Sequence, residues 1–184
     1  MIVKLLDGSS LEVENGASVK DVALKISEGL ARNALAGEVN GELVDLSTPV
    51  NENDVVRIIT LKDEEGLDVY RHTCAHVLAQ AVKTIYPTCK LAIGPTIENG
   101  FYYDFDFTTP ISQADFSKIE EEMKKIIKSD LPITKMEVSR SEALKIMKGF
   151  SETYKVMLIE DLPKDAKITL YKQGAFVELC RGPH

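Results

Sequence analysis

The chain has 184 residues, of which 44% are hydrophobic and 28% are charged, and its 22 Lys/Arg against 29 Asp/Glu give a formal net charge of −7. Such a composition is typical of a globular protein with one large or two small domains. The negative charge disfavours a module that holds nucleic acid by bulk electrostatics, although it is compatible with a site that handles one nucleotide end. There is neither a signal-peptide pattern nor an apolar run near the ~18 residues of a membrane span. Three scattered cysteines indicate a reducing compartment, so we expect a cytoplasmic protein with no membrane partner.

The first sixty residues alternate strand and helix signals. Tight turns at Asp7-Gly8 and Asn40-Gly41 each join two short apolar runs, as in hairpins, and Ser18 is placed to cap a helix that reaches about Leu30. We expect strands over residues 1–6, 11–14, 36–39, 42–46 and 54–60. This order resembles the ubiquitin-like β-grasp fold, and in detail the TGS domain. The stretch has no histidine or cysteine, so we expect an adaptor or binding domain.

Residues 61–66 are polar and end in glycine, which indicates a domain boundary. We therefore expect a β-grasp domain over 1–62 and a second α+β domain over 63–184, with helices packed on a mainly antiparallel sheet. Its predicted helices run from 71 to about 86, from Ser112 through about 127 and from Ser139 to Gly149, and its predicted strands cover 90–97, 100–107, 133–138, 168–171 and 175–179. In the second of these strands the alternation places Phe101, Tyr103, Phe105 and Phe107 on one face.

All three histidines of the chain lie in two short motifs. His72 and His76 are four residues apart and share the polar side of a predicted helix, and Cys180 precedes His184 by four residues. The four side chains form a ligand set suited to tetrahedral zinc. Without metal, the imidazoles could activate a water and stabilise a developing oxyanion. A third reading makes the Cys180 thiolate a covalent nucleophile.

Several motifs in one order resemble bacterial threonyl-tRNA synthetases along the whole chain. They are His72-Thr73-Cys74-Ala75-His76, Ala92-Ile93-Gly94-Pro95, Asn99-Gly100-Phe101-Tyr102-Tyr103-Asp104, Tyr154-Lys155-Val156 and Leu179-Cys180-Arg181-Gly182-Pro183-His184. The resemblance implies that residues from 63 on form an editing domain, of the type shared with alanyl-tRNA synthetases. Such a domain hydrolyses the mischarged seryl-tRNA(Thr).

The resemblance also assigns roles to individual residues. It implies a hydrolytic centre made of His72, His76, Cys180 and His184, with Lys155 also taking part. Tyr103, Glu178 and Arg181 are expected to contact the substrate. Threonyl enzymes of this type often have an aspartate where Glu178 stands here.

The implied partner is tRNA(Thr), in particular its aminoacylated 3′ end. The threonyl branch is thought to work through water without a metal, whereas the alanyl branch binds metal with these ligands, so zinc is possible at the His/Cys site but not required. The ATP-dependent ligation of threonine, its own zinc and the homodimer interface belong to domains further along the family's chain. By this resemblance the sequence ends before the editing domain is complete, and as a fragment it should be monomeric. The alternative reading is a non-catalytic, zinc-stabilised binding module beside a β-grasp adaptor.

Overall fold

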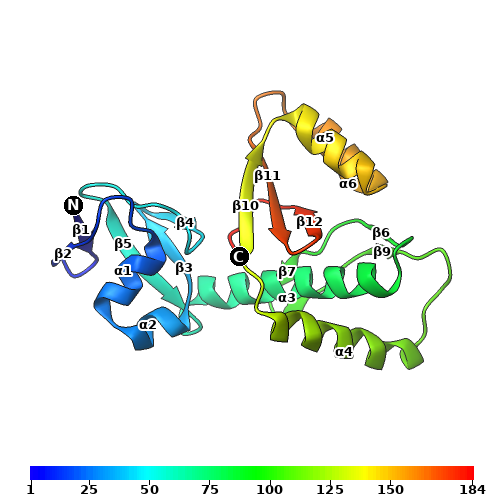
Figure 1. Ribbon diagram of the computed structural model, residues 1–184, viewed down its shortest axis with the longest axis horizontal. Helices are drawn as coiled ribbons and strands as arrows, with labels where there is room; N and C mark the ends of the chain where they lie inside the picture. The colour runs from blue at the N-terminus through cyan, green and yellow to red at the C-terminus, as the bar shows by residue number, and fades with distance from the viewer. The chain divides into compact units, whose positions relative to one another are not determined.

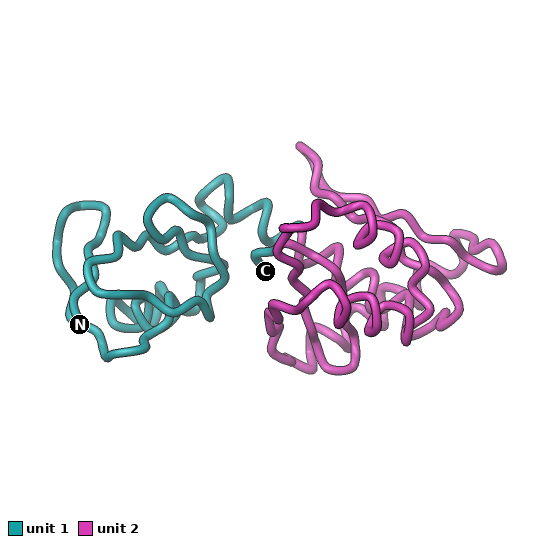
Figure 2. Tube along the Cα trace, turned by 90° about the horizontal axis from the view of Figure 1, so that it is seen from above, with its two compact units in different colours: residues 1–71, 182–184 teal, residues 72–181 magenta.

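The structure, a computed structural model, describes residues 1–184 and divides into two compact units. Figure 2 colours them: the first holds residues 1–71 with 182–184, and the second holds residues 72–181. The helix α3 (Glu64–Ile85) supplies residues to both. The mixed α+β class predicted from the sequence is confirmed, and no helix has an apolar stretch long enough to cross a membrane. The boundary at 62/63 stays a prediction.

The first unit is built on a five-stranded sheet in the order β2-β1-β5-β3-β4 (Figure 1). Its strands are β1 (Ile2–Leu5), β2 (Ser10–Glu12), β3 (Ala34–Val39), β4 (Glu42–Val44) and β5 (Val55–Thr60). The β1–β5 pair is parallel and the other pairs are antiparallel. Helix α1 (Val19–Ile26) buries Val19 and Val22 against Val3 and Val56 of the sheet, so a β-grasp core forms as predicted.

The helix predicted to reach Leu30 ends sooner. Ser27 has an extended backbone, and its hydroxyl accepts the Leu30 N–H, so it closes α1 and caps a second short helix, α2 (Glu28–Asn33). The Ser27 cap satisfies a backbone N–H that would otherwise lack a partner, so ending one helix and starting another here costs little free energy.

Helix α3 begins inside the stretch predicted as a linker. Its first turns belong to the first unit, where Val69 packs with Ala36 and Ile59. A Cβ at Gly66 would lie 1.9 Å from the Thr60 carbonyl oxygen, so only glycine lets the helix approach the end of β5 this closely. Gly66, which in the sequence indicated a domain boundary, therefore permits α3 to pack closely against the end of β5.

The second unit contains a three-stranded antiparallel sheet, β10-β11-β12, and two short two-stranded ladders. Its strands are β6 (Lys90–Leu91), β7 (Thr96–Ile97), β8 (Gly100–Phe101), β9 (Phe105–Asp106), β10 (Ile133–Val138), β11 (Ile168–Gln173) and β12 (Phe176–Leu179). Its other helices are α4 (Gln113–Ser129), α5 (Arg140–Gly149) and α6 (Thr153–Asp161). The long hairpin expected over 90–107 is thus broken into β6–β9 and β7–β8, and helix α6 was not predicted.

Two cores hold this unit together. Val77, Ala81 and Val82 of α3 meet Ile119 and Ile126 of α4, which runs beside α3 in Figure 1. The second core joins helices α5 and α6 to β11 and is formed by Ala143, Met147, Ile159, Ile168 and Leu170. The two cores carry the site residues on α3, α6 and β12.

Candidate active site

His72 and His76 lie one above the other on α3. Their ring centroids are 5.0 Å apart and the rings meet edge to face at 86°. This is the i, i+4 relation that the spacing predicts. His76 is only 9% exposed, so its side of the helix does not face solvent there, contrary to a simple polar-face reading.

Cys180 is held where strand β12 ends. Its N–H donates to the Thr169 carbonyl oxygen at 3.2 Å, and its own carbonyl accepts the Thr169 hydroxyl. Its Sγ lies 3.2 Å from Nε2 of His72. A thiol at hydrogen-bond distance from an imidazole can exchange a proton with it, which suits both proton transfer and nucleophile activation.

Three of the four predicted side chains lie together in the second unit: ligand atoms of His72, His76 and Cys180 are within 4.8 Å of one another. His184, the fourth predicted ligand, belongs to the first unit. Imidazole nitrogens and a cysteine sulfur are donors that tetrahedral zinc accepts. Such an ion would either stabilise the fold or polarise a bound water.

A second cluster contains Lys155, Glu178 and Tyr103. The Lys155 ammonium lies 2.6 Å from Oε1 of Glu178, and the Tyr103 hydroxyl donates to Oε2 at 2.6 Å. The Lys155 ammonium is also 3.4 Å from the Tyr103 hydroxyl. Lys155 and Glu178 are 4% and 2% exposed, so this is an ion pair inside the protein. Both oxygens of Glu178 are engaged, which suits it to orient its two neighbours.

The Tyr103 ring is fixed from two sides. It stacks on Phe105 with centroids 4.7 Å apart and an angle of 19°, as the alternation of aromatics predicts. A Cβ at Gly94 would lie 2.1 Å from Cδ2 of the ring, so the ring rests directly on the glycine backbone. Burial, followed by the negative charge of Glu178, raises the pKa of Tyr103 far above its usual value, so its hydroxyl stays protonated and donates.

Arg181 is exposed and, with Cys180 and Leu158, lines a cavity of about 270 Å³. The Tyr171 hydroxyl lies 3.5 Å from the Arg181 carbonyl oxygen, to which it donates. Arg181 and Cys180 therefore share the wall of one cavity.

Sequence reasoning missed a second ion pair, between the partly exposed Lys83 of α3 and the buried Glu152 at the start of α6. Their charged groups are 2.6 Å apart and Glu152 is 3% exposed. Lys83 lies on the same side of α3 as the histidines, which is a weak signal, and nothing local indicates Glu152 as its partner.

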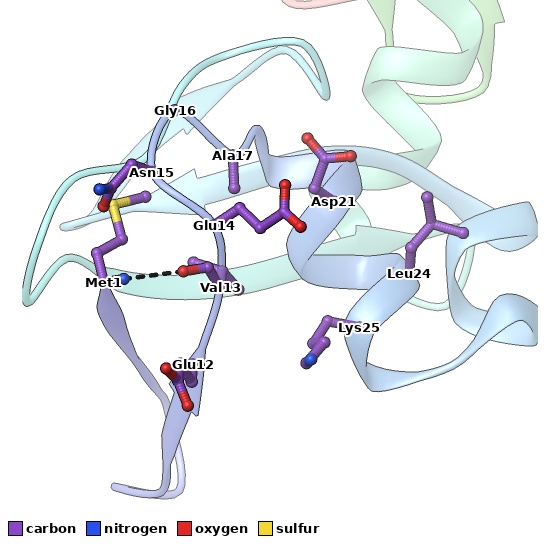
Figure 3. A pocket seen from close by; sticks show the side chains of 10 residues that line it. All are labelled: Met1, Glu12, Val13, Glu14, Asn15, Gly16, Ala17, Asp21, Leu24 and Lys25. Atoms are coloured by element: carbon purple, nitrogen blue, oxygen red, sulfur yellow. Dashed lines mark hydrogen bonds between the residues drawn. The ribbon is translucent and has the colours of Figure 1, made fainter.

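A hollow of about 1000 Å³ lies in the first unit (Figure 3). Glu14 and Asp21 are among the residues that line it, and the Met1 ammonium donates to the Val13 carbonyl oxygen at 2.9 Å. Asp21 already accepts the N–H and hydroxyl of Ser18 in the cap of α1. The hollow has no imidazole or thiol, so we place the candidate chemistry in the His/Cys group.

Comparison with known proteins agrees with the architecture. Residues 1–60 match the family model of the TGS domain. Over 182 residues the chain is 57% identical to threonine–tRNA ligase of Acetivibrio thermocellus, 54% to that of Desulforamulus reducens and 55% to that of Clostridioides difficile. Each match covers 99% of this chain, but 29%, 29% and 28% of the relatives. The resemblance to threonyl-tRNA synthetases is confirmed, and the chain spans less than a third of their length.

Proposed function

We propose that this chain, which begins with a TGS domain and matches threonine–tRNA ligases over 99% of its length, is their N-terminal editing region. Its reaction is the hydrolysis of seryl-tRNA(Thr), and its partner is the aminoacylated 3′ end of tRNA(Thr). The parent enzyme ligates threonine to that tRNA with ATP in domains outside this chain and works as a homodimer. We expect the reducing cytoplasm as its compartment, because the three cysteines are odd in number and scattered along the sequence.

The small difference in size between serine and threonine explains why such a reaction is needed. Serine differs from threonine by one methyl group, which a binding pocket distinguishes by only ~1–3 kcal/mol. A second site that admits the smaller product and hydrolyses it lowers the error further.

The observation that carries the proposal is the short contact between Cys180 Sγ and His72 Nε2, with His76 beside it. In the proposed step a water adds to the ester carbonyl carbon, and the bond from that carbon to the ribose oxygen breaks. An imidazole takes the proton of the water, and a proton is returned to the ribose oxygen as it leaves. Lys155 and Tyr103, oriented by Glu178, hold the polar end of the substrate.

The deciding experiment is the deacylation of seryl-tRNA(Thr), with threonyl-tRNA(Thr) as the control substrate. We expect fast release of serine and slow release of threonine, in this chain or in one extended to the relatives' full length. Cys180→Ser should keep measurable activity, and no seryl group should become attached to Cys180. Trapping such an adduct would replace water attack by a thiolate nucleophile. Equal, background rates on both substrates in the extended chain would end the proposal.

The second candidate is a non-catalytic, zinc-stabilised binding module. The donors of His72, His76 and Cys180, within 4.8 Å of one another in the second unit, favour it over other non-enzymatic roles. Metal analysis separates the two: tightly held, stoichiometric zinc whose removal unfolds the second unit would support the module. Hydrolysis that continues in chelator with the fold intact would exclude it.

A further inference from the structure

The ion pair between Lys83 and Glu152 links separate segments of the second unit. The Lys83 ammonium donates to the carbonyls of Cys89 at 2.7 Å and Pro87 at 3.1 Å, and it lies 2.6 Å from Oε1 of Glu152. Two hydrogen bonds and one ion pair therefore hold this ammonium in place. The other oxygen of Glu152 accepts the Leu91 N–H at 2.9 Å.

These contacts connect α3 and α6, which carry the histidines and Lys155, with β6, whose partner strand begins close to Tyr103. Lys83 is on α3, two turns after His76. Glu152 is the N-cap of α6, and Lys155 follows it by three residues. Leu91 is in β6 and pairs with Phe105 of β9, on whose ring Tyr103 stacks.

Stability alone is a poor reason for this arrangement. A buried ion pair often contributes no more than well-packed apolar residues of the same volume, because both charges lose their hydration. Catalysis, in contrast, depends strongly on placement, and an error of 1 Å can lower a rate about 100-fold.

We propose that Lys83 and Glu152 are positioning residues for ester hydrolysis, which fix Lys155 and Tyr103 relative to the histidines of α3. The inference rests on the proposed function. It assigns no contact between Lys83 or Glu152 and the substrate; both act through the groups they hold.

The test compares Glu152→Gln, Lys83→Met and Lys155→Met in the full-length enzyme. Glu152→Gln retains an oxygen for the Leu91 N–H but loses the charge that holds Lys83. We expect kcat for deacylation to fall about 100-fold while KM changes less than about 3-fold. In the Lys155→Met background, Glu152→Gln should lower kcat by less than about 3-fold, because the group it places is already gone. A merely structural role predicts the full loss in both backgrounds.

The matched control is the pair Glu122–Lys125 of α4, whose charges are 3.0 Å apart and in which Lys125 is exposed and Glu122 partly exposed. Glu122→Gln and Lys125→Met should leave kcat and KM unchanged. The double variant Lys83→Met/Glu152→Gln leaves no unpaired charge and should fold, with kcat as low as in the single variants. Wild-type kcat in a folded double variant, or full additivity with Lys155→Met, would overturn the inference.

A second readout is independent of hydrolysis. Amide hydrogen exchange in the wild-type protein and Glu152→Gln should show faster exchange at Leu91 and in the first turn of α6, with α4 unchanged. If the wild-type protein fails to deacylate but this local effect appears, the proposed function is wrong, whereas the link that Glu152 makes between these segments is supported. Unchanged exchange at these amides would refute the positioning role of Glu152, even if the wild-type protein hydrolyses seryl-tRNA(Thr).

Discussion

The first unit keeps nearly all its ionised groups at the surface, whereas the second buries the Lys155–Glu178 pair and the carboxylate of Glu152. Residues 1–71 hold 7 Lys/Arg and 14 Asp/Glu, while residues 72–181 hold 15 of each, so the first unit carries the whole net charge. In the first unit Arg57 meets Glu38, Asp63 and Glu65 with side chains 25–45% exposed. In the second, Lys155 and Glu178 are no more than 5% exposed.

This difference distinguishes the interactions that stabilise a fold from those that arrange a functional site. The core of the first unit is apolar and needs no internal charge, and Asp45 is its one buried carboxylate. Interior ion pairs cost hydration and are poor stabilisers, so their presence in the unit that also holds His72 and His76 agrees with the function proposed above. Substitutions of similar type in the two units should therefore differ in outcome.

The largest expected effect is on activity, from His76→Ala. We expect deacylation of seryl-tRNA(Thr) to fall about 1000-fold, since a positioned acid–base group contributes roughly 10²–10⁴-fold. His76 is buried, so circular dichroism must show that the variant is folded. The control in the first unit is Glu38→Gln, which should leave the rate unchanged. A wild-type rate in His76→Ala would remove this residue from the mechanism.

Breaking an ion pair should cost more stability in the second unit than in the first. Lys155→Met leaves the Glu178 charge buried and should lower the unfolding free energy by about 3 kcal/mol. Arg57→Met breaks partly exposed pairs and should cost at most about 1 kcal/mol. Chemical denaturation followed by NMR signals from each unit gives both values. Adding Glu178→Leu to Lys155→Met should recover more than half of the loss, and equal costs in the two units would contradict the comparison.

Two glycines extend the comparison to packing. A Cβ at Gly94 would lie 2.1 Å from the Tyr103 ring, and one at Gly37 would lie 2.4 Å from Cγ1 of Val19. Both alanine variants should lose about 1–3 kcal/mol by overpacking. Gly94→Ala should also slow deacylation about 10-fold, because it displaces a ring of the proposed site. Gly149→Ala, with no atom within 4 Å, is the neutral control. Equal deacylation rates in Gly37→Ala and Gly94→Ala would argue against a role for Tyr103.

The features that could be predicted from the sequence were the locally encoded ones. Ser18, Ser112 and Ser139 each precede a helix, and the i, i+4 spacing of His72 and His76 placed them together. In each case the signal and the structure lie within a few residues of one another.

What could not be predicted depends on contacts between distant segments or on weak local signals. Helix α6 has four consecutive apolar residues from Val156 to Ile159 instead of a helical stripe, and its N-cap Glu152 makes no side-chain cap bond. That carboxylate is engaged by Lys83 and Leu91, more than sixty residues earlier. The close contact between the Gly94 backbone and the Tyr103 ring likewise could not be predicted from nearby residues, because a glycine in a turn can be required for several different structural reasons.

The smallest predicted effect concerns pH and Cys89, which is buried in the second unit. Burial raises the pKa of its thiol to about 11, against about 8.5 for an exposed cysteine. Because the folded pKa is the higher one, this contribution to stability is complete below pH ~8.5 and is lost as the pH rises toward 11. We expect the second unit to lose about 1 kcal/mol between pH 8 and pH 9.5. Tyr103, whose pKa is also raised, adds to the loss above pH ~10.

Denaturation of wild type and Cys89→Ala at both pH values measures this effect. The variant starts less stable but should lack most of the slope, and the first unit, which has no cysteine, should show no such slope in either protein. Iodoacetamide should label Cys89 in the folded protein far more slowly than in urea, since the thiolate is the reactive form. The same slope in wild type and variant would mean that another group in the second unit titrates in this window.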